Sequence, residues 1–247
     1  MIKFFRNLRQ QLIADQKFSK YLLYAVGEII LVVIGILIAL QINNWNEGRK
    51  AAQQESLYLN RLLSENKEDL ITFSSSIADL EKGMQTVVKL SEALKNESLS
   101  DRELIQRAND YFKYGSIYPI FTSSTSTFDD LSSTGNLQLI RNTGLRESIV
   151  NHYARHKKTA ERIQIAIDWA LPLDSPFTFE NDIMKFEPST AFLYPETSEK
   201  ILCNELRDNK LVYISNAAVH YWINKDCIQQ LKGLMKATSD LISQLER

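Results

Sequence analysis

Residues 21–40 read YLLYAVGEIILVVIGILIAL and contain one charged side chain, Glu28. A helix of this length spans about 30 Å, which matches the hydrocarbon thickness of a bilayer. A helix in the core of a soluble protein rarely contains so many Ile, Leu and Val residues. The stretch therefore predicts a transmembrane helix. We place it at residues 21–46, because Trp45 is typical of the interface between membrane and water.

A cleaved signal peptide is the alternative interpretation, since basic residues precede the apolar stretch. No pair of small residues typical of a cleavage site follows Leu40, so we predict an uncleaved anchor. Basic residues are more frequent before the span than after it: Lys3, Arg6, Arg9, Lys17 and Lys20 against Arg49 and Lys50. The positive-inside rule then predicts a cytoplasmic N-terminus and an inner-membrane protein whose residues 47–247 are extracytoplasmic, in the periplasm of a two-membrane bacterium.

Residues 1–20 form a basic cytoplasmic tail in which apolar residues recur at helical spacing, namely Ile2, Phe5, Leu8 and Leu12. This spacing is typical of an amphipathic helix that lies on the inner leaflet. An ordinary flank of the anchor would contain the same basic residues without a separate role. Both interpretations stay open.

Three positions inside the span are candidates for helix packing or partner contact: Glu28, Gly35 and Ala39. Gly35 and Ala39 are four residues apart, and such small residues let two membrane helices approach closely. A carboxylate within a bilayer is costly and indicates a function, so Glu28 is a candidate partner contact. If the span instead runs over residues 28–46, Glu28 lies at its cytoplasmic edge and needs no partner. Trp45 is the expected interfacial anchor.

Two stretches resemble the recurring segments of a known family: KFSKYLLYAVGEIILVVIGILIALQINNWNE at residues 17–47, and FDDLSSTGNLQLIRNTGLRESIVNHY at residues 128–153. The family is one of single-pass proteins from Bacteroidota, classed as domain of unknown function 6090. The resemblance implies an inner-membrane location. It implies no activity, because the family has no established one.

The remainder of the chain has the composition of a folded helical protein. Hydrophobic residues make up 44%, the net charge is −1, and only 8 Gly and 5 Pro occur in 247 residues. Sheet-rich proteins usually need more turn residues. Apolar residues repeat at alternating spacings of three and four over residues 59–94, 145–170 and 214–245, which predicts three long helices that pack along these stripes.

The first and third stripes have similar lengths, so we expect their helices to pack antiparallel within one chain. The predicted fold is all-α: an N-terminal transmembrane helix followed by an extracytoplasmic antiparallel helical bundle with a long coiled-coil-like stalk. Residues 51–97 and 211–247 form the stalk and residues 98–210 the head. The alternative is a parallel coiled coil between subunits, in which the same stripes form the subunit interface.

The head contains several local signals. Residues 100–103, SDRE, match a capping box and predict a helix to about Lys113. Residues 122–134 are rich in Ser and Thr, and the turn after them gives a candidate surface site of Ser132, Ser133, Thr134, Gly135 and Asn136. Four prolines in residues 172–198 predict a long loop with short helical turns.

The sequence contains no constellation that predicts catalysis. His152 and His156 are four residues apart, but the residues between them lack the glutamate of a zinc-protease motif. We therefore expect a packed, hydrogen-bonded pair rather than metal ligands. No nucleotide-binding or nucleophile motif occurs. We predict that the protein is not an enzyme, has no cofactor and does not bind nucleic acid.

Charge and cysteines add two weaker predictions. Residues 141–162 are basic and residues 174–199 acidic, so we expect these segments to pack against each other, with an anionic ligand site as the alternative. Cys203 and Cys227 would not lie opposite each other in the predicted hairpin. We therefore favour free thiols, although the sequence leaves a disulfide open.

Two functions fit these features. The first is a membrane-anchored scaffold or partner-binding protein of the bacterial envelope that forms a homo-oligomer or docks another envelope membrane protein. The second is an extracytoplasmic ligand sensor that signals through a partner protein, with the Ser/Thr-rich turn and the long loop facing the ligand. The sequence does not identify the partner, the ligand or the number of subunits.

Overall fold

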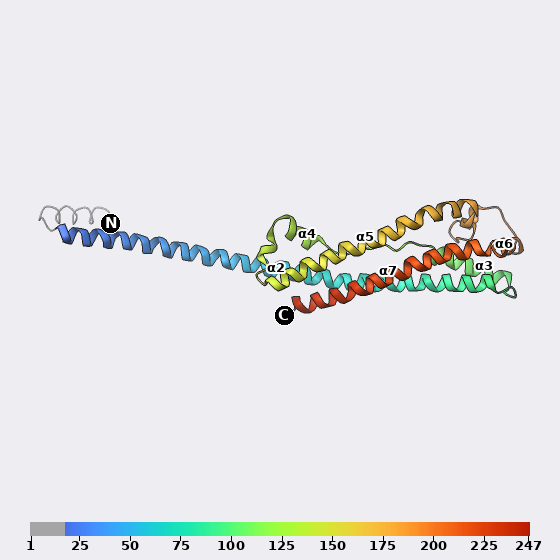
Figure 1. The fold of residues 1–247 in the computed structure, drawn as a ribbon, viewed down its shortest axis with the longest axis horizontal. Coiled ribbons are helices and arrows are strands. Elements are labelled where there is room, and N and C mark those ends of the chain that lie inside the picture. The colour runs from blue at the N-terminus through green and yellow to red at the C-terminus, as the bar shows by residue number, and fades with distance from the viewer. Residues whose placement is uncertain (1–17) are drawn as a thin grey trace. The chain divides into compact units, whose positions relative to one another are not determined.

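The computed structural model describes residues 18–247, so the predictions for the basic tail at residues 1–17 lie outside the described residues (Figure 1). The described chain contains helices and no strand, which confirms the all-α prediction. In chain order the elements are α2 (Phe18–Lys95), α3 (Asp101–Asp110), η1 (Tyr111–Gly115), α4 (Ser126–Ser133), η2 (Asn136–Leu139), α5 (Thr143–Glu180), η3 (Ile183–Lys185), η4 (Ala191–Leu193), α6 (Glu199–Asp208) and α7 (Lys210–Leu245). The chain forms two compact units, Met1–Leu57 and Tyr58–Arg247.

The described part of the first unit is the N-terminal portion of α2. Among the described residues, α2 is the one helix long and apolar enough to span a membrane. Its most apolar window of 18 residues has a mean hydropathy of 2.6, and none of that window is buried within the chain. Ile29 and Leu31 of the same apolar segment, for example, are 64% and 70% exposed. A bilayer would cover such a surface at no cost to backbone hydrogen bonds, since a helix satisfies these internally.

In the second unit, α7 packs antiparallel to α2 along the predicted stripes. At one end of the bundle, Leu62 of α2 packs with Leu241 of α7. At the other end, Leu94 of α2 and Ile214 of α7 share a cluster. Between these ends, the Glu81 carboxylate pairs with the Lys232 ammonium at 2.9 Å. Both stripes are therefore buried within one chain.

Helix α5 is the third long helix of the bundle, and Figure 1 shows it beside α7. It continues through Pro172 and Pro176 to Glu180, so the predicted loop at residues 172–198 is wrong over its first nine residues. Both prolines are exposed, and the buried Ala170 and Phe177 hold the opposite side of the helix against the bundle. Packing of that buried face therefore outweighs the hydrogen bonds that the prolines remove.

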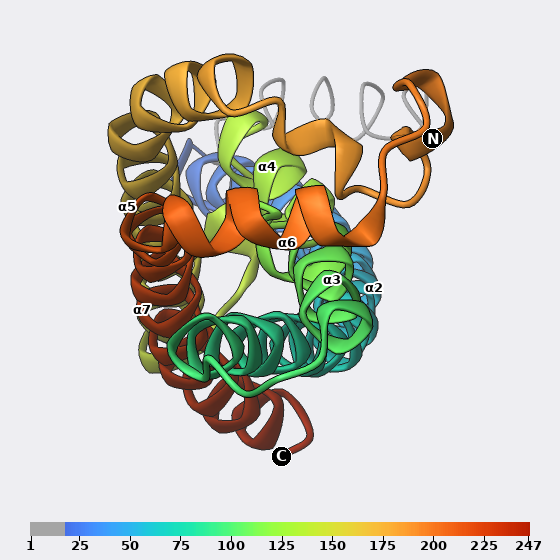
Figure 2. The same ribbon diagram turned by 90° about the vertical axis from the view of Figure 1, so that its right-hand side faces the viewer.

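Short elements close the end of the bundle near Lys95. Figure 2 shows α6 running across this end, with α3 beside it. Ser100 caps α3 as predicted, because its hydroxyl accepts the Glu103 N–H. An aromatic cluster fills the interior, in which Phe112, Phe186 and Tyr213 pack with ring centroids 6.1–6.3 Å apart. The head predicted at residues 98–210 is thus partly a cap on the bundle and partly its third helix.

Element η1 is a single π-helical turn that crosses α2 closely. A Cβ atom added at Gly83 of α2 would lie 2.6 Å from the Tyr114 carbonyl oxygen. One added at Gly115 of η1 would lie 2.5 Å from the Thr86 hydroxyl. Both distances are too short for a Cβ atom unless its neighbours shift, which means the backbone at Gly83 and the buried Thr86 side chain at Gly115. The two glycines therefore set how closely η1 approaches α2.

We predict that Gly83→Ala destabilises the bundle by about 1–3 kcal/mol, because the new methyl group meets a backbone carbonyl that cannot rotate away. Gly233→Ala is the matched control. Gly233 also lies inside a long helix, but nothing lies within 4 Å of its added Cβ. The control should be neutral or stabilising by up to about 1 kcal/mol. Thermal unfolding of the purified full chain, followed by circular dichroism, compares the two variants, and equal effects would contradict the close crossing.

Candidate functional site

The hydroxyls of the Ser/Thr-rich segment mainly attach α4 to α2 and cap the end of α4. The Glu65 carboxylate of α2 accepts hydrogen bonds from the hydroxyls of Ser126 and Thr127 at 2.6 and 2.7 Å and lies at the N-terminus of α4, where a negative charge is favourable. At the C-terminus, three hydroxyls of the candidate surface site donate to helix carbonyls at 2.6–3.3 Å: Ser132 to Asp129, and Ser133 and Thr134 to Asp130. These hydroxyls therefore have a local structural role.

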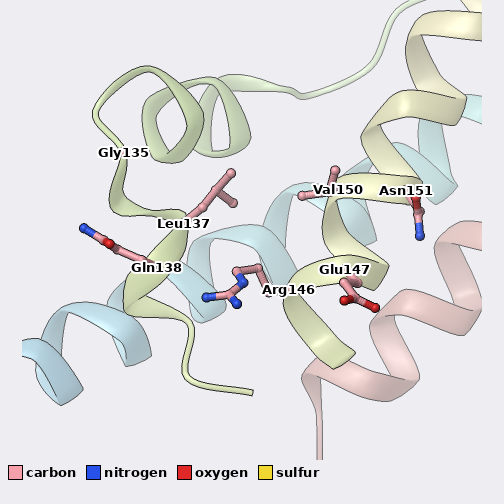
Figure 3. A pocket seen from close by; sticks show the side chains of 7 residues that line it. All are labelled: Gly135, Leu137, Gln138, Arg146, Glu147, Val150 and Asn151. Carbon is pink, nitrogen blue, oxygen red and sulfur yellow. The ribbon is translucent and has the colours of Figure 1, made fainter. Parts of the chain in front are cut away.

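The rest of that candidate site lies beside a pocket. Gly135 adopts a φ of +75°, which ends α4 in the left-handed region, and the Asn136 amide donates to the Tyr58 hydroxyl at 3.3 Å. Of the five predicted residues, Gly135 lines the pocket. Figure 3 shows this pocket between η2 and the start of α5. It has a volume of about 630 Å³ and is lined by Gly135, Leu137, Gln138, Arg146, Glu147, Val150 and Asn151.

The chemistry of this pocket suits binding rather than catalysis. The Arg146 side chain extends from α5 towards η2, while Glu147 points to the other side of the pocket (Figure 3). With two amides and two aliphatic side chains, the lining offers donors, acceptors and an apolar wall. It includes no Ser, Cys or His that could serve as a nucleophile or base. The pocket is therefore a candidate binding surface for a polar ligand.

A second polar centre lies at Asp174 of α5. Its carboxylate accepts hydrogen bonds from the Tyr118 hydroxyl and, at 2.6 Å, from the Asn216 amide, and it lies 2.9 Å from His220 Nε2. Burial opposes ionisation of Asp174, but the hydrogen bonds from His220, Tyr118 and Asn216 outweigh burial and lower its pKa. The Tyr111 hydroxyl extends the network by donating to Asn216 at 2.6 Å. The centre thus ties α5, α7 and η1 together.

The two histidines on α5 form a buried pair, as predicted. The Nε2 atoms of His152 and His156 are 2.8 Å apart, and both rings are almost fully buried. Burial lowers the pKa of His152 to about 3, with His156 as a further cause, and that of His156 to about 4. Both rings are therefore neutral at pH 7. No group of three or more potential metal ligands occurs within residues 18–247.

The predicted packing of the basic segment on the acidic segment is wrong. Residues 143–180 form one continuous helix, so the basic residues before 162 precede the acidic residues after 174 along the same axis. Arg162 instead donates two hydrogen bonds to Asp226 of α7, at 3.1 and 2.8 Å. The cysteines are both buried and free, and they belong to different core clusters, Cys203 near α3 and Cys227 in the middle of the bundle.

The candidate residues of the apolar segment lie on the N-terminal part of α2. Gly35 and Ala39 are exposed, and nothing lies within 4 Å of a Cβ added at Gly35. Trp45 is 68% exposed, with the Arg49 guanidinium 5.7 Å from its ring centroid. Glu28 is half-buried. The Gly35 and Ala39 face is therefore open to another helix.

An apolar surface on α5 was missed by the sequence analysis. Ile165, Trp169, Pro172, Pro176 and Phe179 are all exposed and repeat at spacings of four, three, four and three residues. We call these five residues the α5 stripe. The predicted helix carried its apolar repeat only to residue 170, and the prolines after it predicted a loop, so Pro172, Pro176 and Phe179 were not expected on a helix face. Only the structure distinguishes the buried face from the exposed one.

A family model described as "Family of unknown function (DUF6090)" matches residues 28–161. The chain belongs to this family. The match extends from the apolar part of α2 through α4 to the middle of α5, so it includes the pocket at Arg146 and ends before the α5 stripe. No curated protein and no solved structure matches the sequence.

We predict that the buried histidine pair makes the bundle sensitive to acid. The folded-state pKa values of about 3 and 4 lie below the ordinary value of 6.5, so the unfolded chain binds more protons below pH 6.5. Stability is therefore present above pH 6.5 and is lost as the pH falls towards 4. Between pH 7 and 4.5 each histidine should account for a loss of about 2–3 kcal/mol, and the pair for a loss of about 5 kcal/mol.

The control for this prediction is the double variant His152→Gln/His156→Gln, which cannot gain protons in this range. Asp69 has the opposite effect, because burial raises its pKa to about 6, but it is present in both proteins and cancels in the comparison. Urea unfolding at pH 7 and pH 4.5 measures the difference. Parallel pH profiles for the two proteins would show that the pair is not buried in its neutral form.

Proposed function

We propose that this protein is a membrane-anchored partner-binding protein of the bacterial envelope. The N-terminal part of α2 is the anchor, and the bundle of α2, α5 and α7 presents a docking surface. The observation that supports partner binding is the α5 stripe, because Ile165, Trp169 and Phe179 are 69%, 57% and 80% exposed although the chain has a well-formed core. Contiguous apolar surfaces of this kind usually mark interaction sites.

The proposed location is the inner membrane, with one span, a cytoplasmic N-terminus and a periplasmic bundle. The length and hydropathy of α2 support the span. The excess of basic residues on the N-terminal side supports the orientation. The exposed Gly35 and Ala39 are the positions where a second membrane helix, from another copy or from a partner, would approach most closely.

A second candidate function is ligand sensing through the pocket beside Gly135. The pocket volume of about 630 Å³ and the mixed charge of Arg146 and Glu147 favour a small polar ligand. A ligand bound there would contact both η2 and α5. Such a contact would couple the pocket to the helix that carries the α5 stripe.

We predict that Gln53→Cys is labelled by a membrane-impermeant maleimide added outside spheroplasts, because Gln53 is exposed and follows the span. The two native thiols are buried and should stay unlabelled in the folded protein. Gln10→Cys is the matched control and should react only after the membrane is permeabilised. The reverse pattern would overturn the proposed orientation.

We also predict that a photo-crosslinking amino acid in place of Trp169 or Phe179 forms a discrete crosslinked product in cells that naturally make the protein. The control position is Lys89, which is exposed on α2 away from the α5 stripe. A product of twice the chain mass identifies a second copy, and any other mass identifies a different partner. If the stripe positions give no more product than Lys89, the stripe is not a docking surface and the proposed function fails.

A further inference from the structure

We infer that the α5 stripe binds a single α-helix of a different protein, with the acidic end of that helix beside Lys157 and Lys158 and its basic end beside Glu180 and Asp182. This inference rests on the proposed function, since it specifies the chemistry of the partner that docks on the stripe.

The spacing of the stripe matches a helix. Its residues follow the alternating spacings of three and four along which two helices pack at a small crossing angle. From Ile165 to Phe179 the stripe extends for about 20 Å, or four turns of helix. A partner helix with the same repeat would cover all five side chains at once. A partner helix also satisfies its own backbone hydrogen bonds, so docking on the stripe leaves none of its backbone groups unpaired.

The centre of the stripe has the character of a binding hot spot. The Trp169 ring meets Trp222 of α7 edge-on, with centroids 5.6 Å apart and an interplanar angle of 69°. Trp222 is itself 54% exposed, so two neighbouring indoles stand half-covered on the surface. Tryptophan is among the residues most enriched at hot spots, because its large ring loses much water-exposed area on contact.

The prolines add polar groups to the same surface. A proline inside a helix has no N–H for the carbonyl four residues before it. Pro172 and Pro176 therefore leave the carbonyls of Asp168 and Pro172 without their helical donors. These carbonyls can accept hydrogen bonds from polar side chains that flank the apolar stripe of a partner helix.

Charges at the two ends of the stripe define the partner further. One basic side chain near its start is already neutralised, since Arg162 pairs with Asp226 at 2.8 Å. Lys157 and Lys158 have no ion-pair partner among residues 18–247, and the same holds for Glu180 and Asp182 beyond the other end. Glu161 is the one acidic residue on α5 between Lys158 and Ile165, so the two lysines leave that end with a net positive charge. Along α5 the surface is therefore net positive, then apolar, then negative. A helix with the complementary order gains attraction at both ends.

A second copy of this chain fits less well. Its own α5 stripe would match these charges only if the two α5 helices ran antiparallel. Two copies that enter one membrane in the same direction are related by an axis along the membrane normal. Such an axis makes the α5 helices antiparallel only if both lie flat along the membrane. A helix of another protein carries no such restriction.

The test uses the full chain with Trp45→Phe in nanodiscs, so that fluorescence reports only Trp169 and Trp222. The probe is a synthetic helical peptide of about 21 residues without Trp, with a Leu stripe at the same spacing, acidic residues in one half and basic residues in the other. A control peptide has the same composition with its charges interspersed. Empty nanodiscs give the background for binding to lipid.

We expect the two-halved peptide to bind at least about 5-fold more tightly than the interspersed peptide. Trp169→Ala should weaken binding by about 10-fold or more, because it removes the central indole. Lys157→Glu/Lys158→Glu should weaken it by about 5-fold. Adding Glu180→Lys/Asp182→Lys to that variant should restore binding to within about 2-fold, because the charge order is then reversed as a whole and the peptide can bind in the opposite direction.

Two results would overturn the inference. One is binding that does not change with Trp169→Ala, which would place the peptide elsewhere. The other is binding that stays unchanged in Lys157→Glu/Lys158→Glu, or that the added Glu180→Lys/Asp182→Lys does not restore. Either outcome would show that the charge order does not guide binding. If crosslinking from Trp169 still yields a product in either case, the proposed function stands and only the partner chemistry is wrong. A crosslinked product of twice the chain mass would show that a second copy, and not a helix of a different protein, docks on the stripe, and it would likewise overturn the inference.

Discussion

Packing of α2 against α7 is the interaction on which the rest of the second unit depends. Each helix carries a long apolar stripe, and neither stripe would be shielded from water without the other. Leu62, Phe73 and Leu90 of α2 are at most 1% exposed, and so is Leu231 of α7, which shares a cluster with Phe73. Burying one such side chain is worth roughly 1.5–3 kcal/mol, so the summed effect offsets the entropy cost of ordering two long helices.

Polar groups inside this core define which helix faces meet. Asn66 of α2 donates to the Tyr153 hydroxyl of α5 at 3.2 Å, and Asp69 of α2 accepts the Ser124 N–H at 2.7 Å. A slip of one helix along another would leave these buried groups without partners, at a cost of about 1–3 kcal/mol for each group. The close crossing of Gly83 by η1 adds a steric restriction on the same register.

The surfaces available for function are those that remain exposed after the helices have packed. Helix α5 uses one face to complete the core and the opposite face to present the α5 stripe, and its prolines stand on that outer face. The pocket at Arg146 lies at the start of the same helix. Both proposed binding surfaces therefore depend on how α5 is held, and the network around Asp174 holds it near its far end.

The sequence by itself determined the helical class and the apolar segment, because both depend on local composition. It favoured the pairing of α2 with α7 through a repeat of three and four residues but left a coiled coil between subunits open. The family was identified from two recurring segments. The capped start of α3 and the packed state of His152 and His156 were also predicted from local sequence. The pocket beside Gly135, the network at Asp174 and the exposure of Trp169 and Phe179 were decided only by the tertiary structure. Hydrophobic spacing shows that a helix has an apolar side, but it does not show which of two apolar sides finds a partner within the chain. The course of α5 through Pro172 and Pro176 has the same cause, since long-range packing outweighed a local signal that favours a loop.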